Sequence, residues 1–159
     1  MAAAADTASG GRVATNRKAF HEYVVLDRIE VGLELQGTEV KSVRSGNVTL
    51  TGGYARVENG QATLYDVHIA PYTCGNRFNH EPTRPRRLLL KRKEIDRLAG
   101  QVQQKGCALI PLTLYFRRNR WAKIELGVGK GKQDADKREA LKRKTAEQEA
   151  RRVMRHERQ

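Results

Sequence analysis

Apolar and polar residues alternate through much of the chain, and glycines separate the alternating segments. Val31, Leu33 and Leu35 recur at every second position, the spacing at which one face of a strand is buried. Two further segments, residues 54–57 and 62–67, are joined by four residues that include Asn-Gly, a dipeptide that favours tight hairpin turns. The first part of the pattern therefore predicts a strand followed by a β-hairpin.

A second hairpin is predicted further along the chain. Residues 107–116 are rich in β-branched, leucine and aromatic side chains, and Pro111 among them indicates a bulge or a sheet edge. Residues 118–120 (Arg-Asn-Arg) turn the chain into residues 121–128. This last segment alternates between an apolar face and a face expected to meet water: Ala122, Ile124, Leu126 and Val128 on the first, and Trp121, Lys123 and Glu125 on the second.

Helices are predicted at three places between these strands. Thr38 is a suitable N-cap for a helix over residues 39–45, which would stop at Gly46. Residues 92–104 form an amphipathic pattern, and a short helix is expected over residues 16–21. The apolar stripe of the longer helix consists of Ile95, Leu98, Ala99 and Val102.

These elements favour a mainly β protein with helices (α+β), an antiparallel barrel like the oligonucleotide-binding (OB) fold, with about three helices. The alternation alone leaves a β-sandwich open as the alternative. Composition divides the chain into a disordered leader (residues 1–15), the barrel (16–129) and a basic tail (130–159). The tail contains good helix formers, but its only large apolar side chains are Leu141, Val153 and Met154. We expect it to be disordered when free and helical where phosphates neutralise its charge.

The charge of the chain narrows the choice of partners. It contains 31 Lys and Arg against 18 Asp and Glu, a net charge of +13, which points to a polyanion. No apolar stretch approaches the roughly 20 residues that cross a bilayer, and the start of the chain lacks the features of a signal peptide. Cys74 and Cys107 have no metal-ligand spacing and are expected to be reduced thiols. We therefore expect a cytoplasmic protein that does not bind membranes.

The strongest candidate for binding chemistry is a cluster of six cations within ten residues, namely Arg84, Arg86, Arg87, Lys91, Arg92 and Lys93. An isolated run of this kind is as often a solvated surface as a binding site. In a strongly basic chain that also contains Arg17-Lys18 and Arg117-Arg118, phosphate binding is the better interpretation. Neither the four histidines nor the glycines of residues 127–132 match a catalytic, metal-binding or phosphate-loop motif. We expect no metal and no cofactor.

Six blocks of sequence occur together in one order: Asn16-Arg-Lys-Ala19 with His21 and Tyr23, Glu30-x-Gly32, Gly37-Thr-Glu-Val-Lys-Ser-Val-Arg44, Arg87-Leu-Leu-Leu90, Pro111-Leu-x-Leu-Tyr115, and Gly129-Lys-Gly-Lys132 with Asp136-Lys-Arg138. In these blocks the chain resembles the SsrA-binding protein (SmpB) family over nearly its whole length. The Gly-Thr-Glu-Val-Lys-Ser block and the late Asp-Lys-Arg are specific together.

The resemblance implies a ribosome-rescue factor without enzymatic activity and without cofactors. An OB-type barrel would bind the tRNA-like domain of transfer-messenger RNA (tmRNA) and stand in for the missing anticodon arm. Elongation factor Tu with GTP would take part through alanyl-tmRNA in delivery to stalled 70S ribosomes. The tail would enter the 16S rRNA decoding centre and the empty mRNA channel, so that trans-translation tags the nascent peptide.

The resemblance also implies two sets of site residues. The RNA-binding set is Asn16, Arg17, Lys18, His21, Glu30, Lys41, Arg87, Leu90, Lys91, Arg92 and Lys123. The set for the decoding centre is Lys130, Gly131, Lys132, Asp136, Lys137, Arg138, Lys142 and Arg143.

One position departs from the family pattern. Much of the family has an aromatic residue or His immediately before Asp-Lys-Arg, whereas this chain has Ala135. A stacking contact at this position, about 1–3 kcal/mol per base, is therefore absent, and electrostatics or another group such as His21 must compensate.

Two alternative functions are a ribosomal or cold-shock-like OB protein and a small nuclease. Cleavage of RNA in the presence of Mg²⁺ would distinguish the nuclease.

Overall fold

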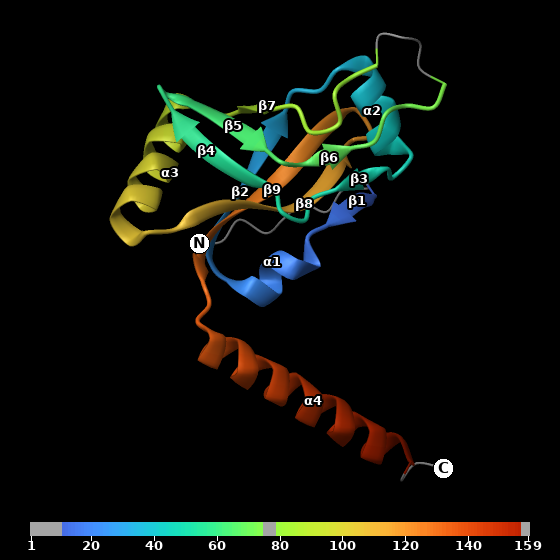
Figure 1. The fold of residues 1–159 in the computed structure, drawn as a ribbon, viewed down its shortest axis with the longest axis vertical. Coiled ribbons are helices and arrows are strands. Elements are labelled where there is room, and N and C mark those ends of the chain that lie inside the picture. The colour runs from blue at the N-terminus through green and yellow to red at the C-terminus, as the bar shows by residue number, and fades with distance from the viewer. Residues whose placement is uncertain (1–10, 75–78, 157–159) are drawn as a thin grey trace.

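A computed structural model describes residues 11–74 and 79–156. The chain forms nine strands and four helices in these ranges (Figure 1). In order they are β1 (Arg12–Thr15), α1 (Arg17–Glu22), β2 (Tyr23–Leu33), α2 (Gly37–Arg44), β3 (Val48–Thr49), β4 (Tyr54–Glu58), β5 (Gln61–Tyr65), β6 (His68–Ile69), β7 (Arg86–Leu89), α3 (Arg92–Lys105), β8 (Ala108–Arg117), β9 (Trp121–Gly131) and α4 (Asp134–His156). The mixed α+β class expected from the sequence is confirmed.

Seven of the strands form one antiparallel sheet in the order β1-β8-β4-β5-β7-β2-β9. Because β9, the last strand in this order, also pairs with β8, the sheet closes into a barrel. Strand β1 joins the barrel by pairing with β8. Strands β3 and β6 form a separate two-stranded sheet. Closure by main-chain pairing is the arrangement expected of a barrel rather than of a sandwich.

Both predicted hairpins are present. In the turn between β4 and β5, Asn59 and Gly60 have φ values of 52° and 70°, as an Asn-Gly turn requires. In the second hairpin, β8 and β9 pair with a shift of register after Pro111, which is the predicted bulge. The predicted inner face of β9 is buried at Ile124, Leu126 and Val128, which join the core of the barrel.

The helices agree with the sequence analysis except at one cap. Helix α3 ends at Gly106, whose φ of 58° is left-handed, and α1 is capped by Asn16. Helix α2 begins two residues before the predicted start, so Thr38 is not its N-cap. The Glu39 carboxylate accepts the Gln36 backbone N–H at 2.8 Å, so Gln36 is the N-cap, two residues before Thr38. The Thr38 hydroxyl is instead hydrogen-bonded to His80 Nδ1 at 2.9 Å.

The structure corrects both ends of the predicted barrel. Residues 12–15 had been assigned to the leader but form β1, which pairs with β8 and packs Val13 and Ala14 against the core. The rest of the predicted leader, residues 1–10, lies outside the described residues. At the other end, β9 continues to Gly131 along β2, so Lys130 and Gly131 belong to the barrel.

Two glycines near the end of β9, Gly127 and Gly129, are sites of close packing. A Cβ atom at Gly127 would lie 2.8 Å from Leu112 Cδ1, and one at Gly129 would lie 2.9 Å from Ile110 Cδ1. A side chain at either position would therefore clash with the small apolar cluster that Ile110 and Leu112 form with Ala19 of α1.

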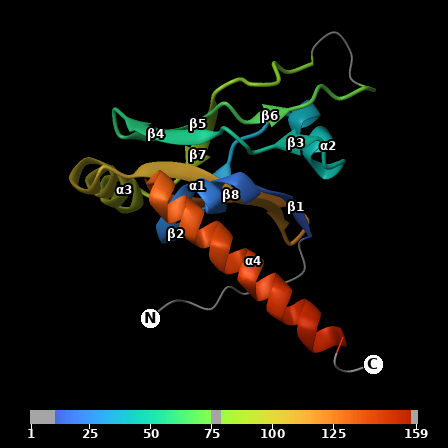
Figure 2. The same cartoon turned by 60° about the horizontal axis from the view of Figure 1, so that its bottom comes forward.

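Most of the predicted tail is helical in the structure. Residues Asp134–His156 form a single helix, α4, which projects from the barrel (Figures 1 and 2). Its described side chains are exposed, apart from a half-buried Lys137. Acidic residues precede arginines by four positions at Glu139/Arg143 and Glu147/Arg151, a spacing that favours helix even without burial.

Candidate nucleic-acid interface

A groove of about 530 Å³ brings together five of the predicted RNA-binding residues, and we call it the Glu30 groove. Its predicted members are Glu30, Arg87, Leu90, Lys91 and Lys123, and the turn at Gly60 and the start of α3 complete it. The alternation of the strands explains this convergence. Along β7 the side chains are buried, exposed, buried and exposed in turn, so Arg87 points outward between two buried neighbours.

Glu30 is held at the groove by two side chains of β8. The Tyr115 hydroxyl donates a hydrogen bond to Glu30 Oε2, and Arg117 Nη1 lies 3.4 Å from Oε1. Burial of the Tyr115 hydroxyl and its hydrogen bond to Glu30 raise the pKa of Tyr115 above its ordinary value. The Tyr115 hydroxyl therefore stays protonated and donates its hydrogen bond to Glu30. This bond holds the Glu30 carboxylate in one orientation at the groove.

Tyr115 ends the Pro111-Leu-x-Leu-Tyr115 block of the sequence, and the resemblance implied no role for it. The pairing of the strands brings it there, because Tyr115 lies opposite Lys123 on β9, and β9 in turn lies beside β2 with Glu30. This juxtaposition depends on the register of three strands, which the spacing of residues along the chain does not contain.

Arg92 lies at the rim of the Glu30 groove. A Cβ atom at Gly60 would lie 3.0 Å from Arg92 Nη1, so the guanidinium extends over the β4–β5 turn. Its side chain is exposed, and its ion pair with Asp96 is long, at 3.5 Å. Such a pair leaves the guanidinium available to a stronger anion.

The predicted residues on α1 divide into an exposed and a buried group. Arg17, Lys18 and His21 are exposed. Asn16 was predicted to bind RNA but is only 3% exposed. Its Oδ1 accepts the Ala19 N–H, and its Nδ2 donates to the carbonyls of Leu50 and Pro111 at 3.3 and 3.0 Å. The side chain therefore fixes the start of α1 against the barrel, and its burial and its internal hydrogen bonds do not favour the predicted RNA contact.

Lys41 is exposed on α2 and does not line the Glu30 groove. Its ammonium group lies 5.3 Å from the centre of the Tyr72 ring. The structure thus places Lys41 on a different part of the surface from the other predicted residues.

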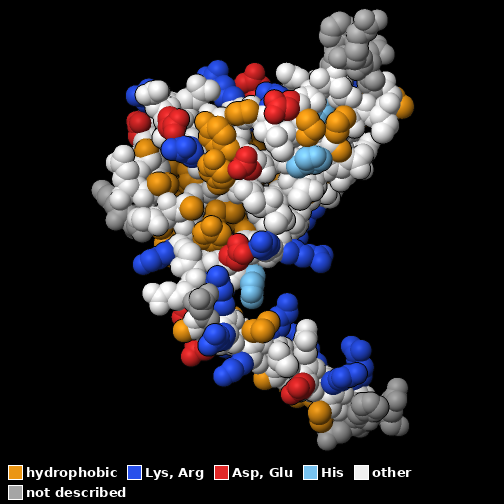
Figure 3. Space-filling model, in the orientation of Figure 1, with side chains coloured by type: hydrophobic (Ala, Val, Ile, Leu, Met, Phe, Trp, Pro, Cys, Tyr) orange, Lys and Arg blue, Asp and Glu red, His pale blue; other side chains and the backbone are white. Residues whose placement is uncertain are grey.

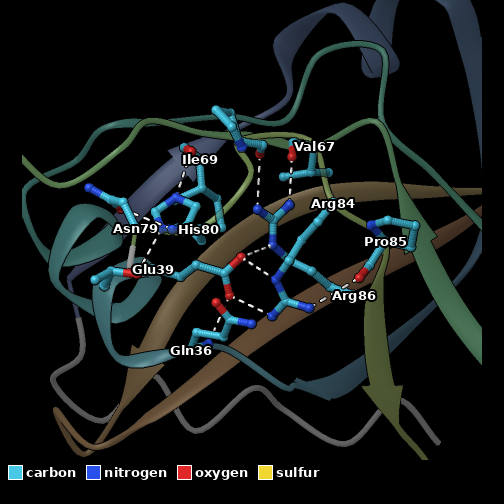
Figure 4. A network of polar contacts seen from close by, with 11 residues as sticks. Gln36, Glu39, Val67, Ile69, Asn79, His80, Arg84, Pro85 and Arg86 are labelled. Carbon is cyan, nitrogen blue, oxygen red and sulfur yellow. Dashed lines mark hydrogen bonds and ion pairs between the residues drawn. The ribbon is translucent and has the colours of Figure 1, made fainter. Parts of the chain in front are cut away.

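Two of the six clustered cations, Arg84 and Arg86, donate hydrogen bonds to a buried carboxylate, that of Glu39 (Figure 4). Arg86, which is 0% exposed, donates from Nε to Glu39 Oε1 at 2.8 Å. Arg84 makes two hydrogen bonds to the same carboxylate, at 2.8 and 2.7 Å. Arg86 is buried and therefore cannot meet a phosphate at the surface, and the partly exposed Arg84 directs its guanidinium to the same carboxylate on α2.

Glu39 remains ionised in this cluster. Burial alone would raise its pKa, but hydrogen bonds from Arg84 and from the Gln36 N–H, together with the charge of Arg86, outweigh it. The pKa of Glu39 consequently lies below its ordinary value. The remaining Arg86 donors reach the carbonyls of Val67 and Pro82 at 2.7 and 2.9 Å, so the cluster is fully hydrogen-bonded on this side.

The predicted tail residues form two groups. Lys130, Gly131 and Lys132 stay with the barrel, where the Lys132 N–H and Nζ donate to the carbonyls of Glu22 and Phe20 at 2.8 and 3.2 Å. The other group projects on α4, where Lys and Arg side chains are spread along the helix (Figure 3). Its members are Asp136, Lys137, Arg138, Lys142 and Arg143.

Two other kinds of site were also sought. Within residues 11–74 and 79–156, no three His, Cys, Asp or Glu side chains are grouped so that they could hold a metal ion. Among the helices in those ranges, none is long and apolar enough to cross a membrane. Cys74 is exposed and Cys107 is buried, and no disulfide joins them.

Comparison with known proteins bears on the whole chain. The family model described as "SmpB protein" matches residues 13–156. The SsrA-binding protein of Carboxydothermus hydrogenoformans is 52% identical over 143 residues, which cover 90% of this chain and 95% of that protein. The SsrA-binding protein of Caldicellulosiruptor saccharolyticus is 56% identical over 142 residues, 89% of each chain.

A solved structure described as "tmRNA-SmpB: a journey to the center of the bacterial ribosome" contains a chain with the same fold. That chain is 45% identical to this one, with a TM-score of 0.66, and the match covers 80% of this chain and 93% of the other. The resemblance seen in the six sequence blocks is thus confirmed by the family model, by relatives of nearly equal length and by the fold. This chain belongs to the SsrA-binding protein (SmpB) family.

Proposed function

We propose that this protein binds the tRNA-like domain of tmRNA and brings it to stalled ribosomes for trans-translation, in the cytoplasm. The single observation that carries the proposal is the Glu30 groove, in which the residues implied by the family motifs converge from separate strands. The relatives are named SsrA-binding proteins, and the similar solved chain is described with tmRNA and the ribosome.

The groove has the chemistry that recognition of folded RNA requires. Arg87, Lys91 and Lys123 supply cations for phosphates, which give affinity but no sequence information. Glu30 repels phosphates and accepts hydrogen bonds only from donors, such as a base amino group. We infer that the cations bind the backbone and that Glu30 contributes to the choice of RNA.

The barrel and the tail divide the work. The barrel would hold the tRNA-like domain in place of an anticodon arm. Helix α4 would bring its cations into the 16S rRNA decoding centre and the empty mRNA channel, with Asp136, Lys137 and Arg138 nearest the decoding centre. Elongation factor Tu with GTP would act through alanyl-tmRNA and needs no contact with this chain.

The deciding experiment measures binding of the protein to the isolated tRNA-like domain, with elongator tRNA as competitor, over a range of salt concentrations. Arg92→Ala should weaken binding and reduce the slope of log affinity against log salt by about one, if Arg92 holds one phosphate. Arg56→Ala is the matched control, since Arg56 is an exposed arginine outside the groove whose ion pair with Glu58 is also on the surface. Equal binding of both RNAs would contradict the proposal.

The same preparations test the proposed lack of enzymatic activity. The RNA should be shifted on a gel by the protein but remain intact after incubation with Mg²⁺. Cleavage that co-purifies with the protein would favour the nuclease alternative. The tail is tested by reversing the charges of Lys137 and Arg138, which should reduce tagging on stalled ribosomes more than reversal at Arg151 and Arg152.

A further inference from the structure

A second hollow adjoins the Glu30 groove and has a different character. It has a volume of about 260 Å³ and lies between β2, β7 and the turn that joins β8 to β9. The two depressions share Gly32, Leu89 and Lys123, so they form one continuous surface. The second hollow is floored by apolar residues such as Leu33, Leu35 and Phe116 and carries no acidic residue in its lining.

Two large apolar side chains stand exposed at this hollow. Trp121 is 53% exposed and Leu89 is 52% exposed. Leu89 is exposed at the end of β7, directly after the buried Leu88, and Trp121 is exposed at the start of β9. Gly32 makes room for Leu89, because a Cβ atom there would lie 3.1 Å from Leu89 Cβ. The two side chains thus form an apolar platform that is open to solvent. Contact with water does not stabilise such exposed apolar surface.

The charges around the platform indicate what covers it. Arg120 and Lys123 line the hollow, and Arg117 lines the adjoining groove. An apolar aromatic platform with cations at its rim is complementary to a flat base attached to a phosphate backbone, since every base has a π-face that stacks on an aromatic ring. A purely apolar protein segment would offer no negative charge to Arg120 and Lys123.

We propose that Trp121 and Leu89 receive one unstacked base of the bound RNA while Arg120 and Lys123 neutralise its backbone. The proposal rests on the function proposed above and adds a base-stacking contact to it. This contact is independent of position 135, where Ala135 offers no ring. It would explain how the chain keeps an aromatic contact with RNA on the barrel itself.

The chain offers a direct readout, because Trp121 is its single tryptophan. A base stacked on the indole quenches its fluorescence. Titration of the full-length protein with the tRNA-like domain should therefore quench tryptophan emission in step with the gel shift. A gel shift with unchanged emission would overturn base stacking and leave the proposed function intact. Absence of any gel shift would instead refute the proposed function.

Variants provide the second arm. Trp121→Ala should weaken binding of the tRNA-like domain about 5- to 150-fold, the range of one stacking contact, whereas Trp121→Phe should stay within about threefold. Tyr54→Leu is the matched control, an exposed aromatic outside both depressions that should leave affinity unchanged. If Trp121→Ala binds the tRNA-like domain normally but fails in tagging on ribosomes, the platform contacts the ribosome rather than this RNA and the proposal is wrong.

Discussion

Replacing Glu39 by Gln tests the buried ion cluster that joins α2 to Arg84 and Arg86. The substitution removes one negative charge with little change of shape, and leaves the fully buried guanidinium of Arg86 without its counter-ion. Arg84 loses the same partner, but it is partly exposed and water can solvate it. Removing one partner of a buried pair costs about 3–5 kcal/mol, because the remaining charge stays in a poorly solvated place.

The free energy of unfolding is measured by urea denaturation followed by circular dichroism. With a slope of about 2 kcal/mol per molar urea, the expected loss shifts the midpoint of Glu39→Gln by about 2 M. Glu34→Gln is the control, because Glu34 is an exposed acid of the same sequence region and should change stability by less than about 0.5 kcal/mol. A loss below about 1 kcal/mol for Glu39→Gln would refute the reasoning.

The same cluster predicts the effect of acid. Because the pKa of Glu39 is lower in the folded protein than in the unfolded chain, its contribution to stability is complete above the ordinary carboxyl pKa. It is lost as the pH falls through the folded pKa, since the unfolded state then binds the proton first. Urea midpoints measured from pH 7 to pH 3 should therefore fall more steeply for the wild type than for Glu39→Gln. Parallel curves would contradict this assignment.

Three further changes have defined outcomes. Tyr115→Phe should reduce the preference for the tRNA-like domain over elongator tRNA about fivefold, because Glu30 loses its orienting hydrogen bond. Competition binding measures this ratio of affinities, and an unchanged ratio argues against the orienting role of Tyr115. Asn16→Ala should lower the free energy of unfolding by about 2 kcal/mol in urea denaturation, since a cap and two buried bonds are lost. Truncation after Gln133 should leave that free energy within about 0.5 kcal/mol of the wild type, whereas truncation after Gly129 should lower it by more than 1 kcal/mol, because it removes the end of β9.

Local patterns were sufficient for most of the barrel. The Asn-Gly turn, the bulge at Pro111 and the inner face of β9 each depend on residues that are neighbours in sequence, and each is present as predicted. The start of α2 was misplaced because Thr38 is the better N-cap by residue type. Glu39 competes by accepting the Gln36 N–H, and it is held in place by an arginine 47 residues away, which no local pattern contains.

The candidate site was predictable in its residue types but not in its arrangement. Arg86 and Arg87 are adjacent cations, yet one is buried and the other lines the Glu30 groove. Strand alternation could have separated them, since Arg86 shares a face with Leu88. The partner that makes the burial of Arg86 tolerable lies on α2, and only the assembled fold identifies it.

The pairing of β2 with β9 has a consequence for how the chain folds during its own synthesis. Tyr23 pairs with Gly131 and Gly32 with Lys123, so this long ladder of the barrel joins residues about 100 positions apart. A growing chain can complete the β4–β5 hairpin early, but the barrel stays open until residue 131 has emerged. Until then the outer strands present unpaired main-chain groups that can join another chain. A protein built in this way is most vulnerable to aggregation when its own translation stops short of β9.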